Sequence, residues 1–251
     1  MADRNSPVGV FDSGVGGIGT LAALRRELPR ERFLFYGDTA NAPYGTKTRD
    51  EVMACVSRVM EHLLAQDVKA VVIACNTATA VAAAELRARY ELPIIGIEPA
   101  LKPAHEMRRE GSILVLATPM TLKLEKFRAL YERYGEGAIP LPCPGLMELV
   151  EREADEEARR YLLSLFAPYD LTKVDAVVLG CTHYVFLRPI LRQILPDSVA
   201  VLDGNDGTAR QLRRVLAAHD LLSDGQGSVQ LETSGNPAIV LPVMQRLLGR
   251  A

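Results

Sequence analysis

The chain has 251 residues, of which 48% are hydrophobic and 24% are charged, a balance that suits a globular protein with a substantial core. Its formal net charge of −2 argues against a nucleic-acid-binding protein, because such proteins carry a basic surface. No apolar run reaches the roughly 18 residues of a membrane-spanning helix, and residues 1–7 lack the apolar stretch of a signal peptide. We therefore expect a cytoplasmic protein.

Strand-like and helix-like segments alternate along almost the whole chain. The predicted strands are residues 8–12, 33–36, 70–74, 94–97, 113–117, 138–141, 176–180 and 199–202. The predicted helices are residues 18–28, 50–66, 77–90, 122–134, 145–165 and 205–218. This alternation is typical of parallel sheets with right-handed crossovers. It predicts an α/β fold of mostly parallel sheets flanked by helices. A repeated spacing, 62 residues from Ser13 to Cys75 and 63 from Thr118 to Cys181, further predicts two pseudo-symmetric lobes with the active site in the cleft between them.

The two lobes are expected to divide the chain unequally. We assign residues 1–97 plus 211–251 to the first lobe and residues 98–210 to the second. In the tail, residues 229–233 alternate like an edge strand and residues 238–248 resemble a closing helix. The tail is therefore predicted to return to the first lobe.

Two cysteines occupy matching places in the two halves. The apolar runs 71–74 and 177–180 end at Cys75 and Cys181, and each thiol is followed by hydroxyl or amide side chains and a helix-like segment. Buried parallel strands have such unbroken apolar runs, and their carboxyl ends face the ligand crevice of an α/β sheet. A helix N-terminus favours thiolate over thiol. The pair suggests a reaction that needs one proton carrier on each side of a substrate.

The remaining cysteines and the histidines give weaker signals. Cys55 and Cys143 are interpreted as small buried residues. His183 follows Cys181 closely enough to stabilise its thiolate or exchange a proton with it, although a buried structural histidine is the alternative. No motif with zinc-ligand spacing occurs, so no metal site is expected.

Two loops at predicted strand ends carry further candidates. After the first strand, Asp12 could belong to a proton relay, and the Ser13 hydroxyl could bind a substrate carboxylate. The glycines that follow do not complete a dinucleotide-binding fingerprint. After the second strand, residues 38–45 form either a simple turn or a loop that lines the site, with Tyr44 and the Gly45 amide touching substrate. These two interpretations remain open.

Four motifs, taken in order, resemble those of glutamate racemases, in the aspartate/glutamate racemase superfamily. They are Asp-Ser-Gly-Val-Gly-Gly from Asp12, Pro-Tyr-Gly from Pro43, Cys-Asn-Thr from Cys75 and Gly-Cys-Thr-His from Gly180. The resemblance covers residues 8–248. It implies two α/β lobes, no cofactor, a two-thiol reaction that interconverts L- and D-glutamate for peptidoglycan, and a homodimer.

 The resemblance also assigns roles to individual residues. Cys75 and Cys181 are implied to be the acid/base thiols, Asp12 to assist Cys75, and His183 to assist Cys181. The residues implied to contact substrate are Asp12, Ser13, Tyr44, Gly45, Asn76, Thr77, Thr118, Thr121, Thr182 and His183. Asp38 and Glu151 match acids near the site of the family less securely.

Three alternatives to a glutamate racemase stay open. A non-catalytic protein that binds dicarboxylates or amino acids would explain a cleft but not the duplicated thiols. A redox dithiol protein usually holds its two cysteines close in sequence, unlike Cys75 and Cys181. Aspartate racemases resemble this chain too, but they usually carry Glu where His183 stands.

Overall fold

The computed structural model describes residues 3–250, which divide into two compact units. Unit 1 comprises residues 3–98 and 205–250, and unit 2 comprises residues 99–204. The boundaries expected from the sequence lie at 97/98 and 210/211, so the second crossing occurs six residues earlier than expected. The reason is that helix α10 (Asn205–Ala218) is uninterrupted and packs against α1 (Ile18–Glu27) of unit 1.

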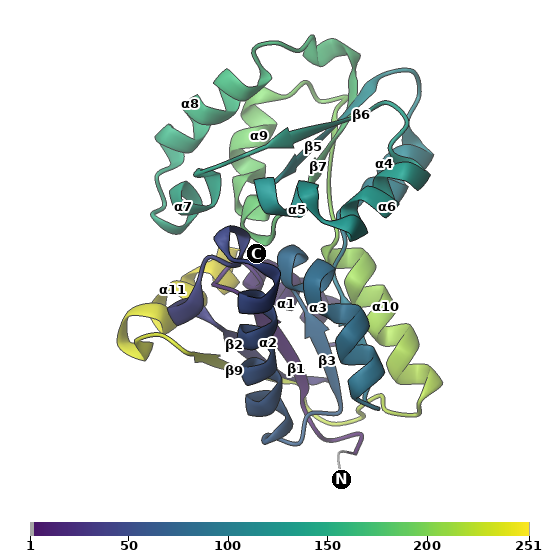
Figure 1. Cartoon of the computed structure of the whole chain (residues 1–251), viewed down its shortest axis with the longest axis vertical. Helices are drawn as coiled ribbons and strands as arrows, with labels where there is room; N and C mark the ends of the chain where they lie inside the picture. The colour runs from purple at the N-terminus through teal and green to yellow at the C-terminus, as the bar shows by residue number, and fades with distance from the viewer. Residues whose placement is uncertain (1–2, 251) are drawn as a thin grey trace. The chain divides into compact units, whose positions relative to one another are not determined.

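Unit 1 is built on a five-stranded parallel sheet in the order β4-β3-β1-β2-β9. Its strands are β1 (Val8–Asp12), β2 (Arg32–Gly37), β3 (Ala70–Ile73), β4 (Ile94–Gly96) and β9 (Ser228–Thr233). The central strand β1 is buried along its length, as its apolar sequence predicts. The tail strand β9 lies at the edge beside β2, which is the place its alternating pattern indicates (Figure 1).

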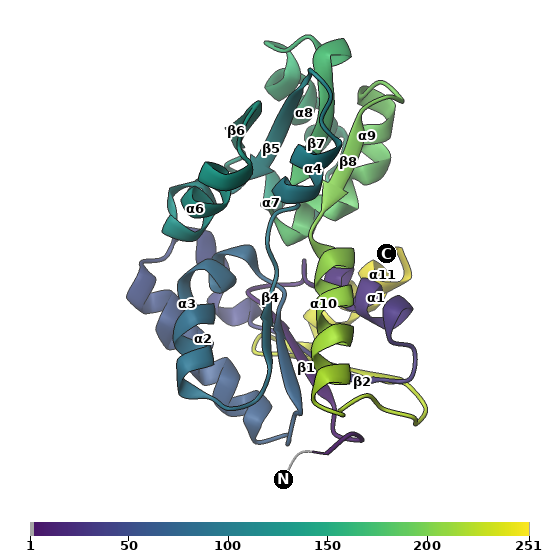
Figure 2. The same ribbon diagram turned by 90° about the vertical axis from the view of Figure 1, so that its right-hand side faces the viewer.

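Helices cover both faces of this sheet, as parallel strands require. Helices α2 (Arg49–Leu64) and α3 (Asn76–Arg89) pack together on one side, and α1, α10 and α11 (Pro237–Arg250) lie on the other (Figure 2). Helix α2 begins with a capping box, in which Thr48 and Glu51 satisfy each other's backbone N–H groups. Two short 3₁₀ turns, η1 (Thr39–Asn41) and η2 (Tyr44–Thr46), shape the loop between β2 and α2.

Unit 2 contains a four-stranded parallel sheet in the order β6-β5-β7-β8. Its strands are β5 (Ser112–Ala117), β6 (Ala138–Pro142), β7 (Val174–Leu179) and β8 (Ala200–Asp203). Alternate residues of β5 enter two separate apolar clusters, with Leu114 and Leu116 in one and Ile113 and Val115 in the other. Burial on both faces explains why this strand is apolar without alternation. The two parallel sheets confirm the α/β fold class.

The helices of unit 2 are shorter than the sequence predicts. They are α4 (Leu101–Met107), α5 (Pro119–Lys123), α6 (Glu125–Tyr134), α7 (Leu146–Glu151), α8 (Asp155–Phe166) and α9 (Arg188–Ile194), with 3₁₀ turns η3 (Leu171–Lys173) and η4 (Thr182–Leu187). The single helices predicted over 122–134 and 145–165 are wrong. Leu124 is extended and separates α5 from α6, and Glu153, at a φ of 53°, lies in the break between α7 and α8.

No helix within residues 3–250 is long and apolar enough to cross a membrane.

Candidate active site

Strand β3 delivers Cys75 to the carboxyl edge of the unit 1 sheet. Cys75 is the N-cap of α3, and its Sγ accepts a hydrogen bond from the Ala78 N–H at 3.4 Å. The thiol also contacts the Ser13 hydroxyl, with 3.4 Å between Sγ and Oγ. A helix N-terminus stabilises negative charge through its free N–H groups and its dipole. The Cys75 sulfur therefore lies where the N-terminus of α3 can stabilise negative charge.

Asp12 ends the neighbouring strand β1 and is completely buried. Its Oδ2 accepts a hydrogen bond from the Gly14 N–H at 3.1 Å. Gly17 allows the start of α1 to approach this carboxylate, because a Cβ at Gly17 would lie 2.6 Å from the Asp12 Cβ and 2.9 Å from the Ala74 Cβ. Gly17 thus serves close packing around the end of β1.

Replacing Gly17 with Ala is expected to lower the free energy of unfolding by about 1–3 kcal/mol, because the added methyl group overpacks the end of β1. The matched control is Gly207→Ala in α10, where an added Cβ meets nothing within 4 Å. At that helical position alanine is expected to be neutral or to stabilise by up to about 1 kcal/mol. Urea unfolding of both variants checks that only Gly17→Ala is destabilised, and equal stabilities of the two variants would contradict the packing argument.

The loop after β2 is tied together by the carboxylate of Asp38. This carboxylate accepts hydrogen bonds from the Tyr44 hydroxyl at 2.5 Å and from Asn41 Nδ2 at 2.9 Å, and the Asp38 N–H donates to the Asp12 carbonyl at 2.9 Å. Tyr44 is buried. Burial raises the pKa of Tyr44, and the hydrogen bond and charge of Asp38 and the nearby Cys75 raise it further. Tyr44 is therefore held as a neutral phenol in electrostatic range of Cys75.

The first turn of α3 carries two more of the predicted residues. Asn76 and Thr77 are both buried beside Cys75. Among the described residues, nothing hydrogen-bonds to the buried Asn76 Oδ1. An unsatisfied buried acceptor is costly, so its presence is typical of a site that receives a donor from a ligand.

In unit 2, strand β7 leads through Gly180 to Cys181, which is 9% exposed. Its Sγ lies 3.9 Å from Nδ1 of His183, and Nε2 of His183 lies 2.9 Å from Oε1 of Glu151. His183 is buried, whereas the Glu151 side chain is 35% exposed. The three side chains form a thiol, imidazole and carboxylate series. The contact with Glu151 orients the ring and leaves Nδ1 facing the sulfur.

The carboxylate at the end of this series is stabilised in its charged form. Burial alone would raise the pKa of Glu151, but the hydrogen bond and the charge of His183 outweigh it, and the pKa falls below its ordinary value of 4.5. Glu151 comes from the end of α7, which the sequence alone did not place near His183. The structure therefore places Glu151 beside His183 and Cys181. We call each thiol with its neighbouring site residues a half-site, so Glu151 belongs to the Cys181 half-site.

Hydroxyl groups follow the strand ends of unit 2 as well. Thr118 caps α5 at the carboxyl end of β5, where its Oγ1 accepts from the Thr121 N–H at 3.2 Å and lies 2.9 Å from the Thr121 Oγ1. Thr182, directly after Cys181, is buried. Because β5 and β7 are neighbours in the sheet, their carboxyl ends share one edge.

Two residues near Cys181 were not singled out as functional from the sequence. Cys143 follows β6 and is buried; burial and the charge of Cys181 raise its pKa to about 12. Its carbonyl accepts a hydrogen bond from the Tyr184 hydroxyl at 3.1 Å. Cys143 thus remains a neutral thiol, in line with its interpretation as a small buried residue.

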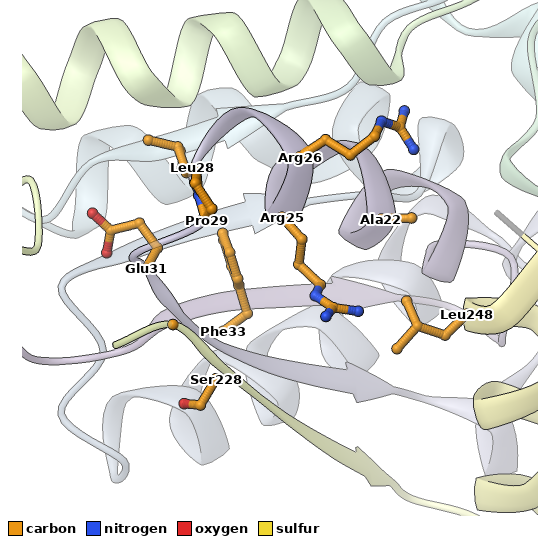
Figure 3. A pocket seen from close by; sticks show the side chains of 10 residues that line it. Ala22, Arg25, Arg26, Leu28, Pro29, Glu31, Phe33, Ser228 and Leu248 are labelled. Atoms are coloured by element: carbon orange, nitrogen blue, oxygen red, sulfur yellow. The ribbon is translucent and has the colours of Figure 1, made fainter. Parts of the chain in front are cut away.

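A hollow of about 380 Å³ in unit 1 lies away from this chemistry. It opens at the amino ends of β2 and β9, where Arg25, Phe33 and Leu248 are among its lining residues (Figure 3). None of the candidate site residues is among them. Within residues 3–250, no group of three or more His, Cys, Asp or Glu side chains is arranged to hold a metal ion.

The chain is similar in sequence to known proteins along most of its length. Residues 19–212 match the family described as Asp/Glu/Hydantoin racemase, and the chain belongs to this family. It is 46% identical to glutamate racemase from Bifidobacterium adolescentis over 98% of both chains. These findings confirm the resemblance that the motifs indicate.

Solved structures agree with this assignment. The crystal structure of glutamate racemase from Thermus thermophilus, in complex with β-chloro-D-alanine, is similar with a TM-score of 0.85 and 37% identity, over 98% of this chain and 94% of that one. Glutamate racemase from Escherichia coli, in complex with L-glutamate and the activator UDP-MurNAc-ala, is similar with a TM-score of 0.83 and 28% identity, over 96% and 94% of the two chains.

Proposed function

We propose that this protein is a cofactor-independent racemase that interconverts L-glutamate and D-glutamate and supplies D-glutamate for peptidoglycan. The observation that carries the proposal is the pair of thiols at equivalent strand ends, each with its own partners. Cys75 has Ser13 and the N-terminus of α3, and Cys181 has His183 and Glu151. Membership of the racemase family supports the reaction class.

Racemisation removes the α-proton from one face of the amino acid and returns a proton to the other. In the proposed reaction one cysteine, as thiolate, takes the α-proton and becomes a thiol. The other cysteine, as thiol, gives its proton to the opposite face and becomes a thiolate. The roles exchange for the opposite enantiomer. This scheme requires one thiol on each face of the α-carbon, and it avoids the movement that a single base would need.

The substrate carboxylates and the carbanion need hydrogen-bond donors. We assign this role to hydroxyl groups and backbone N–H groups at the strand ends, which would stabilise negative charge as it develops. The hydroxyl residues are Ser13, Thr77, Thr118, Thr121 and Thr182. The unsatisfied Asn76 Oδ1 is suited to accept a hydrogen bond from the substrate ammonium. Tyr44 and Gly45 complete the proposed contacts.

Glutamate is proposed as the substrate because the relatives named above are glutamate racemases. Aspartate is the alternative substrate, and His183 beside Cys181 favours glutamate. A protein that only binds dicarboxylates would have no need of two thiols with acid/base partners.

The proposal is tested by incubating the protein with L-glutamate in heavy water while optical rotation and α-deuterium are followed. Rotation is expected to fall to zero. The D-glutamate product should carry deuterium from its first appearance, while the remaining L-glutamate stays mostly protonated. Retained rotation would refute the racemase, and a parallel incubation with L-aspartate that loses rotation faster would refute the choice of substrate.

We further propose that the protein works in the cytoplasm as a homodimer. All four cysteines are free thiols, which suits a reducing compartment and a mechanism that depends on thiol chemistry. The homodimer is proposed from the family resemblance alone.

A further inference from the structure

The tail strand β9 ends beside the loop that carries Asp38 and Tyr44. Strand β9 pairs with β2 in parallel as far as Gly37 and Thr233, and the Ser234 N–H then donates to the Gly37 carbonyl at 3.1 Å. The end of the tail strand therefore reaches the carboxyl edge of the unit 1 sheet, where the Cys75 half-site lies.

Three consecutive residues of the tail, which we call the tail clamp (Thr233, Ser234 and Gly235), hold the start of this loop. The hydroxyl groups of Thr233 and Thr39 are 2.7 Å apart, and Ser234 Oγ accepts from the Ala40 N–H at 3.0 Å. Gly235 permits close approach, because a Cβ there would lie 2.4 Å from the Thr39 Oγ1. The Ser234 side chain also hydrogen-bonds to the phenol of Tyr36, the residue before the last residue of β2.

The loop that the tail clamp holds includes Tyr44, which lies within electrostatic range of the Cys75 thiol. Thr39 and Ala40 follow Asp38, whose carboxylate binds the Tyr44 hydroxyl and whose N–H binds the Asp12 carbonyl. Any shift at Thr39 or Ala40 would therefore be passed to Asp38 and Tyr44, close to Cys75.

We propose that Thr233 and Ser234 are positioning residues for the Cys75 half-site, acting through the loop of residues 38–44. This inference rests on the proposed racemase function for its kinetic consequence. The tail clamp touches neither thiol; it holds the loop so that Tyr44 and Asp38 stay against the site. Without it, we expect the loop to loosen and Cys75 to become more accessible.

The test compares the wild type with Thr233→Val/Ser234→Ala, which removes both hydroxyl groups and keeps the bulk of Thr233. The matched control is Ser228→Ala at the exposed opposite end of the same strand. For each protein, racemisation kinetics in both directions, the melting temperature and the rates of iodoacetamide modification at Cys75 and Cys181 are measured, the last by peptide mass spectrometry. Cys181 serves as an internal reference because it lies in the other unit.

The double variant is expected to lose about tenfold in kcat/KM, the effect of about 1.4 kcal/mol, and to be modified several-fold faster at Cys75 with Cys181 unchanged. The control should match the wild type. Unchanged rates at Cys75, or equal acceleration at both thiols, would overturn the proposal in favour of a purely structural tail. If the double variant does not fold, Ser234→Ala alone is judged by the same readings. An inactive wild type would refute the racemase, whereas the thiol modification rates would still test the tail clamp.

Discussion

Replacing either Cys75 or Cys181 with alanine is expected to abolish racemisation of glutamate. Each thiol serves as the base in one direction and as the acid in the other, so neither direction survives the loss of one sulfur. Acid/base groups of this kind contribute about 10²–10⁴-fold to the rate, and turnover should fall at least that far in both directions. The loss of optical rotation of L- and D-glutamate measures the effect. A Cys181→Ala variant with undiminished turnover is incompatible with the scheme.

The single variants Cys75→Ala and Cys181→Ala also test whether the two thiols act on opposite faces of the α-carbon. The remaining thiol can still remove the proton that it faces and return a deuteron from heavy water to the same face. Cys75→Ala and Cys181→Ala are therefore expected to exchange the α-proton of opposite enantiomers without inverting them. Cys55→Ala is the matched control, because Cys55 is buried in α2 and has no place in the proposed reaction. If both variants exchanged the same enantiomer, the thiols would not act on opposite faces.

Replacing His183 with Asn is expected to lower kcat by about 10²–10⁴-fold, because His183 is the group in contact with the Cys181 sulfur that can exchange a proton with it. Glu151→Gln should cost less, since Glu151 acts on the thiol only by orienting the imidazole. Steady-state kinetics of the two variants test this order. A larger loss in Glu151→Gln than in His183→Asn would contradict the proposed series.

The contact between His183 and Glu151 predicts that the stability of the protein depends on pH. The pKa of Glu151 in the folded protein is lower than its ordinary value of 4.5. Its contribution to stability is therefore fully present above that value and is lost as the pH falls through the lowered pKa. Between about pH 6 and pH 3, wild type should lose more stability than Glu151→Gln, which has no carboxylate to protonate. Denaturant unfolding across this range checks the sign.

The local sequence was sufficient to predict much of the fold and the centre of the site. Apolar runs that end at Cys75 and Cys181 predict buried strands followed by helices, and both strands and the helix after Cys75 are present. The long helices predicted in unit 2 failed because a single residue outside helical geometry, Leu124 or Glu153, interrupts an amphipathic pattern that continues on both sides.

His183 could be proposed as a partner of Cys181 because it lies two residues further along the chain, but the partners from distant segments could not be derived from residue patterns alone. Glu151 and Asp38 are suggested only by the family resemblance, and the contacts of the tail clamp are not suggested by any motif. These contacts join segments far apart in the chain, such as Glu151 with His183 and Thr39 with Thr233. A hydrogen bond between distant segments depends on where the strands and helices place those segments. The residues that form it show no sequence periodicity from which the bond could be predicted.

What the sequence determined by itself was therefore the alternation of strands and helices, the parallel sheets and the location of both thiols at strand ends, because burial on two faces imposes a pattern that is read directly from neighbouring residues. What only the tertiary structure decided was which side chains from distant segments complete the surroundings of each thiol and hold the loop after β2. That choice depends on the order of the strands in each sheet and on the return of the tail to β2, which bring together residues that no local pattern connects.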